Sequence, residues 1–123
     1  MKDENRPDLL QRTKSFAVRI VRMYVSMPKS VEAQVLGKQV LRSGTSIGAQ
    51  YHEAQRAKSD ADFISKLEGA LQELDETCYW LELIVEVGIF GEGKIEPLRE
   101  EAEELIKIMV TIVKQVKERA RKK

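Results

Sequence analysis

The sequence contains few of the residues that interrupt helices, bind metals or cross-link chains. Its 123 residues include three Pro, seven Gly, one Cys and one His. A lone cysteine excludes an intramolecular disulfide framework, and the scarcity of helix breakers permits long helices. No run of about 18 apolar residues occurs, so we expect no membrane span. Residues 1–7 lack the apolar stretch of a secretory signal, and the expected location is therefore cytoplasmic.

The overall composition is that of a folded chain. Hydrophobic residues make up 42% and charged residues 33%, which supplies both a packed core and a solvated surface. The length fits one domain, which we place at residues 1–123. Four helices of about 20–28 residues joined by short loops would use this length fully.

Hydrophobic periodicity predicts four helices. Apolar residues recur at spacings of three and four over residues 8–27, 31–56 and 60–87, and again from about Pro97 onward. Pro28, the polar stretch 58–62 and a glycine-rich stretch at 88–93 separate these segments, and Ser30 and Ser59 are suitable N-cap residues. The predicted fold is all-α, an antiparallel up-down-up-down four-helix bundle.

Two local features predict close packing between helices. Gly44 and Gly48 lie one turn apart inside the second predicted helix, at a cost of about 1 kcal/mol each relative to Ala. Close approach of a neighbouring helix would offset this cost. The fourth predicted helix has an apolar arc of roughly 200°, wider than one bundle face needs. We therefore predict that it forms a subunit interface through four residues: Ile106, Ile108, Val110 and Val113.

Residues that could carry catalysis are sparse. His52 is the only histidine, and a helical metal site would need several inward-facing ligands. The glutamates of residues 100–104 match half of a magnesium motif, but the second acidic half is missing. Cys78 lies on the apolar seam of the third predicted helix and is interpreted as a core residue. We expect no catalytic residues, no bound metal and no cofactor, and hence a protein that is not an enzyme.

Charge is segregated along the chain although its formal net charge is only +1. Residues 1–58 carry net +6, residues 59–113 net −10 and residues 114–123 net +5. Such segregation suits either a polyanion bound at the basic segments or subunits that dock basic face to acidic face. Solvated helix faces would give the same pattern. The candidate polyanion-binding residues are Arg12, Lys14, Arg19, Arg22, Lys114, Lys117, Arg119, Arg121, Lys122 and Lys123.

A family resemblance covers the chain from about Lys14 to Val116. It rests on seven stretches taken in order: 14–16 (Lys-Ser-Phe), 27–29 (Met-Pro-Lys), 41–49 (Leu-Arg-Ser-Gly-Thr-Ser-Ile-Gly-Ala), 53–54 (Glu-Ala), 61–67 (Ala-Asp-Phe-Ile-Ser-Lys-Leu), 73–77 (Glu-Leu-Asp-Glu-Thr) and 80–81 (Trp-Leu). With these motifs the chain resembles the four-helix-bundle family named for proteins encoded in 23S rRNA intervening sequences. The segment 42–49 is the most specific of the motifs.

The resemblance implies an up-down-up-down bundle that assembles into a cyclic homopentamer. A related branch, the accessory proteins of diversity-generating retroelements, is thought to bind a reverse transcriptase and nucleic acid. That branch is strongly basic, whereas this chain has a pI near 7.8, and we place it in the main family. The leading hypothesis is a homo-oligomeric bundle that binds RNA or DNA. The alternative is an adaptor that recruits a protein partner through its acidic third helix or the glycine face of its second.

Overall fold

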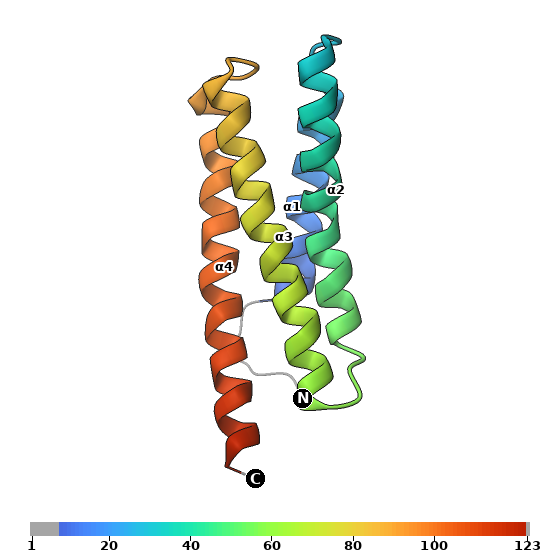
Figure 1. Cartoon of the computed structure of the whole chain (residues 1–123), viewed down its shortest axis with the longest axis vertical. Helices are drawn as coiled ribbons and strands as arrows, with labels where there is room; N and C mark the ends of the chain where they lie inside the picture. The colour runs from blue at the N-terminus through green and yellow to red at the C-terminus, as the bar shows by residue number, and fades with distance from the viewer. Residues whose placement is uncertain (1–7, 123) are drawn as a thin grey trace.

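Four helices connected by short loops make up the computed structural model, which describes residues 8–122. They are α1 (Leu9–Val25), α2 (Val31–Ala54), α3 (Asp60–Glu86) and α4 (Glu92–Arg121). Consecutive helices run antiparallel, and α4 extends beyond the other helices at the end that carries the C-terminus (Figure 1). The predicted up-down-up-down four-helix bundle is confirmed.

Side chains that precede two of the helices fix where those helices start. Asp8 accepts a hydrogen bond from the backbone N–H of Gln11, and Ser59 accepts one from the N–H of Asp62 at 3.0 Å. Asp62 in turn accepts from the N–H of Lys58, so two free backbone donors are satisfied reciprocally. Ser30 is the N-cap residue of α2, as predicted, but its side chain makes no capping hydrogen bond.

The start of α4 differs from its prediction. The helix begins at Glu92 with Gly91 as N-cap, so Pro97 lies inside it and not at its first turn. Proline removes one hydrogen bond to the carbonyl four residues earlier. The extra turn places Ile95, only 1% exposed, in the core, and this burial offsets the lost bond.

One continuous core runs between the four helices. The large side chains that are fully buried in it come from every helix: Leu9, Phe16, Ile20, Val40, Ile47, Leu67, Leu74, Leu81, Ile84, Ile95, Leu105 and Met109. Helix α1 packs against α2, α2 against α3, and α3 against α4, while α1 and α4 meet over a smaller area. Helices α1 and α3 lie diagonally across the bundle.

Two glycines of α2, Gly44 and Gly48, lie directly against α1. A Cβ atom added to Gly44 would lie 2.9 Å from Cγ1 of Ile20, and one added to Gly48 would lie 3.3 Å from Oγ1 of Thr13. The predicted close approach is confirmed at both positions. The glycine face of α2 is therefore covered by α1, and it is not open to an adaptor's partner as the alternative hypothesis supposed.

A buried polar pair joins α2 to α3 inside this apolar core. The hydroxyl oxygens of Ser43 and Thr77 are 2.8 Å apart, and both residues are fully buried. Thr77 Oγ1 also lies 2.7 Å from the backbone oxygen of Glu73. Because an unpaired buried hydroxyl is costly, this contact favours one register between the two helices.

Among residues 8–122, none of the helices combines the length and the hydrophobicity that a membrane span requires.

Candidate interaction surfaces

The segment 42–49, the most specific part of the sequence resemblance, is occupied by contacts between helices. Arg42 of α2 forms ion pairs with Glu73, at 3.3 Å, and with Glu76 of α3. The indole N–H of Trp80 donates to Glu76 at 3.2 Å, and this bond, followed by the one from Arg42, lowers the pKa of that carboxyl. Together with Ser43, Arg42 therefore ties α2 to α3.

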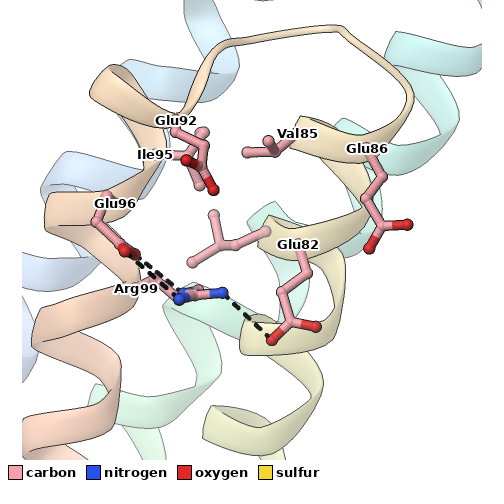
Figure 2. Close-up of a pocket in the computed structure, with 8 residues that line it drawn as sticks. Glu82, Val85, Glu86, Glu92, Ile95, Glu96 and Arg99 are labelled. Carbon is pink, nitrogen blue, oxygen red and sulfur yellow. Dashed lines mark hydrogen bonds and ion pairs between the residues drawn. The ribbon is translucent and has the colours of Figure 1, made fainter.

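A pocket of about 210 Å³ lies between the end of α3 and the start of α4. Figure 2 shows the guanidinium of Arg99 held between Glu96 of its own helix and Glu82 of α3. The nearby Glu96 carboxylate is the main reason that the pKa of Arg99 is raised. The remaining lining comprises two further carboxylates and an apolar floor: Glu86, Glu92, Leu81, Val85 and Ile95. The pocket is net acidic, and its one cation is already paired.

Two candidates for catalytic chemistry were the Cys78 thiol and the glutamates of residues 100–104. Cys78 is half-buried, and burial, with smaller contributions from Glu103, Asp75 and Glu82, raises the pKa of its thiol to about 11. A thiol with so high a pKa is a poor nucleophile at neutral pH. Within residues 8–122, no three His, Cys, Asp or Glu side chains are grouped so that they could hold a metal ion. Of the glutamates in 100–104, Glu101 is engaged by Arg12.

Most of the predicted cations at the C-terminal end have carboxylate partners within the chain. Lys117 pairs with Glu68 of α3 at 3.2 Å, and Arg119 pairs with Asp60 at 3.1 Å. Arg121 and Lys122 both pair with a single carboxylate, that of Glu118. Lys114 is exposed and makes no ion pair with any described residue, while Lys123 lies outside the described residues. This basic end is therefore less available to a polyanion than its sequence suggests.

The predicted cations of α1 fall into two groups. Arg12 donates two hydrogen bonds to Glu101 of α4, at 2.7 and 3.1 Å, and these bonds raise the pKa of its guanidinium. Lys14, Arg19 and Arg22 are exposed, and the ion pairs of the described chain include none of them. Helix α1 also has no acidic residue along its length. Its charge is therefore largely uncompensated.

Exposed apolar side chains accompany these cations on α1. Leu10 is 44% exposed, Val18 and Val21 are each 40% exposed, and Val25 is 73% exposed. Their spacings of eight, three and four place them on one side of the helix, with Lys14 among them. We call these five residues the α1 face. Sequence reasoning missed it, because only one stripe of apolar residues was followed over residues 8–27, although this second stripe has the same helical spacing.

The interface predicted on α4 is corrected in part. Val113 is only 6% exposed and belongs to the core of the monomer, so it is not free to contact another subunit. Ile106 and Ile108 are half-buried and pack against that core, and Val110 is also half-buried. The wide apolar arc of α4 is thus largely used within the chain. The partial exposure of Ile106, Ile108 and Val110 leaves their role at an interface a prediction.

The fold and its surfaces define a small antiparallel helical bundle that exposes apolar and basic side chains along one face of α1. The family model described as 23S rRNA-intervening sequence protein matches residues 6–111, and the chain belongs to that family. It is also similar to the crystal structure of a protein of unknown function from the S23 ribosomal protein family of Bacteroides thetaiotaomicron. The two share 42% identity with a TM-score of 0.81, over 85% of this chain and 97% of the other. The comparison with curated proteins gives no match.

Proposed function

We propose that this chain is a non-enzymatic, self-associating bundle protein of the cytoplasm that acts by binding another macromolecule. The α1 face carries the proposal, since it exposes four large apolar side chains along one helix. Contiguous apolar surface of this kind marks an interaction site more often than a plain solvated surface. The family resemblance implies a homopentamer, and we propose that this chain assembles as five copies.

Several candidate reactive groups already have other roles, which supports a binding function over catalysis. The Cys78 thiol has a raised pKa, so little of it is thiolate near neutral pH. Arg99 is held by two carboxylates, and Glu101 by Arg12. Measurable turnover of a substrate by the purified chain would contradict this part of the proposal.

Nucleic acid is the partner that the unpaired cations favour. Arg19 and Lys114 are exposed, make no ion pair within the described chain and lie outside the α1 face. Lys117 and Arg121 carry the same charge but are paired with Glu68 and Glu118. Contact with phosphate releases counterions, whereas a cation that must first leave a carboxylate gains less. We therefore assign phosphate contacts to the unpaired set.

The test is titration of a fluorescent RNA hairpin at several salt concentrations. Removing two phosphate contacts in an Arg19→Gln/Lys114→Gln variant should lower the slope of log affinity against log salt by about 1.8. A Lys117→Gln/Arg121→Gln variant loses the same charge and should keep the wild-type slope. Equal losses in both variants would contradict the assignment, and no binding at about 50 mM salt would remove nucleic acid from the proposal.

A protein partner is the second candidate, because the valines of the α1 face offer nothing to phosphate groups. An adaptor would be expected to bury Val21 and Val25 against an apolar surface. Pull-downs from cell extract with wild-type and Val21→Ser/Val25→Ser baits would distinguish a protein partner from a nucleic-acid partner. A specific protein retained only by the wild-type bait would favour the adaptor, and identical recoveries would count against it.

A further inference from the structure

The α1 face combines apolar surface with positive charge that has no counterpart nearby. From Leu9 to Val31 the chain has no Asp or Glu. Lys14 lies among the exposed valines, and Arg22 lies one turn after Val18 at the edge of the same face. A partner for this face must therefore offer both carboxylates and apolar surface.

A surface of that chemistry is present on the opposite side of the same chain. Asp75, Tyr79 and Glu82 follow one another at helical spacings of four and three, so they share one exposed side of α3. Glu103 is exposed on α4 where the two helices meet, and it acts with Asp75 and Glu82 on the Cys78 thiol. Arg99 also acts there, but it is paired with Glu82 and Glu96. Tyr79 is 57% exposed. We call Asp75, Tyr79, Glu82 and Glu103 the acidic face. Asp75 and Glu103 take part in none of the ion pairs found among residues 8–122.

Half-buried apolar residues of α4 border this acidic face. Ile106 and Val110 follow Glu103 at helical spacings of three and four, so the three residues share one side of α4. Ile106 and Val110 were both predicted from the sequence to form a subunit interface. Ile106 and Val110 add apolar surface beside these carboxylates on α4, and Tyr79 adds it on α3.

The two faces cannot meet within one chain. Helix α1 packs against α2 and along α4 but makes no packing contact with α3, which lies diagonally across the bundle. Figure 1 shows α1 behind α2 and α3, with the α3–α4 pair on the other side of the molecule. Contact between the faces therefore requires two copies of the chain.

We infer that the α1 face of one copy docks onto the acidic face of the next. This inference rests on the self-association proposed above and specifies its surfaces. A second copy is favoured because its acidic face complements the charge of the α1 face. An anionic membrane or a nucleic acid would also match that charge, but it would leave Tyr79, Ile106 and Val110 without a partner. The contact joins two different surfaces, so each copy can bind two neighbours, and repetition closes a ring if the rotation allows. Arg19, on the side of α1 that faces α4, stays exposed for phosphate.

Charge exchange between the two faces tests this arrangement. One variant carries Lys14→Glu and Arg22→Glu, and the other carries Asp75→Lys and Glu103→Lys. All four positions are exposed, so circular dichroism should report an unchanged bundle. Each variant alone presents like charges on both faces and should have the mass of a monomer, 14.1 kDa, by light scattering. A chain that carries all four substitutions exchanges the charges of both faces, so every contact again joins opposite charges. It should assemble as the wild type does, whatever the number of copies in the ring.

The outcomes separate this inference from the proposed function. A wild-type chain that stays monomeric at about 100 μM would overturn self-association itself, and the docking with it. Wild type and both variants assembled alike would leave self-association standing and overturn the docking. Two monomeric variants together with a four-substitution chain that also stays monomeric would overturn the pairing of these two faces. Anionic vesicles that bind wild type, but not the Lys14→Glu/Arg22→Glu variant, while the chain stays monomeric would assign the α1 face to a membrane instead.

Discussion

Removing the hydroxyl of Thr77 tests whether the buried polar pair with Ser43 stabilises the contact between α2 and α3. Thr77→Val replaces the hydroxyl with a methyl of similar size, so the packing volume is nearly unchanged. Ser43 Oγ then keeps only a long contact of 3.4 Å to the backbone oxygen of Val40. A buried hydroxyl without a good partner costs about 1–3 kcal/mol. We expect Thr77→Val to lower the free energy of unfolding by about 1–2 kcal/mol.

The reciprocal change should cost less, because the two hydroxyls have different second partners. In Ser43→Ala, Thr77 retains its 2.7 Å contact with the backbone oxygen of Glu73, so its donor stays satisfied. The expected loss is about 0.5–1 kcal/mol. The double variant leaves no unpaired hydroxyl, and its loss should be smaller than the sum of the two single losses. The expected coupling between the two residues is therefore about 1 kcal/mol.

Urea unfolding of all four chains, followed by circular dichroism at one fixed protein concentration, measures this coupling. A fixed concentration matters because self-association adds to apparent stability. Single losses that simply add in the double variant, within about 0.3 kcal/mol, would refute the argument that the hydroxyls depend on each other. A Thr45→Val variant is a control for the hydroxyl-to-methyl change, since Thr45 Oγ1 contacts only backbone oxygens of its own helix.

Two further predictions concern α2 and Cys78. Gly44→Ala should lower stability by about 1–2 kcal/mol in thermal melts, because its Cβ would lie 2.9 Å from the Ile20 side chain. Gly48→Ala, whose nearest contact is Thr13 at 3.3 Å, should stay within about 0.5 kcal/mol of wild type or gain stability from helix propensity; equal losses would contradict the packing argument. Alkylation of Cys78 at pH 8 should be roughly 200-fold slower in the folded chain than in urea, since a thiol pKa of about 11 leaves little thiolate. The folded-state rate should rise about tenfold per pH unit up to about pH 10, and a rate that is flat over this range would contradict the raised pKa.

The arrangement of the helices could be predicted from the sequence because it depends on regular spacing. Stripes of apolar residues and capping residues such as Ser59 placed three helices to within two residues of their observed ends. The start of α4 was wrong because Pro97 is a common first-turn residue, and burial of Ile95 outweighed that preference. Local signals therefore identified the helices, while the energy of packing decided where the last one begins.

The surfaces were harder to predict because they depend on which side chains meet across helices. The sequence does not distinguish Lys117 and Arg121 from the unpaired Arg19, because all three lie in basic segments. Only the fold brings Glu68 next to Lys117. Val113 was assigned to an interface because apolar width alone does not distinguish core from surface. The α1 face, in contrast, follows a simple spacing and could have been found by looking for a second stripe on the first helix.

The contacts that segment 42–49 makes with neighbouring helices have a consequence for how such chains can diversify. Arg42, Ser43 and Gly44 each contact a neighbouring helix, so substitutions there alter the bundle itself. The α1 face contributes little to the core, and its side chains can change at small cost to folding. The segment that makes the chain recognisable is thus separate from the surface that would select a partner. Related bundles could therefore exchange partners through substitutions on one side of one helix while keeping the same framework.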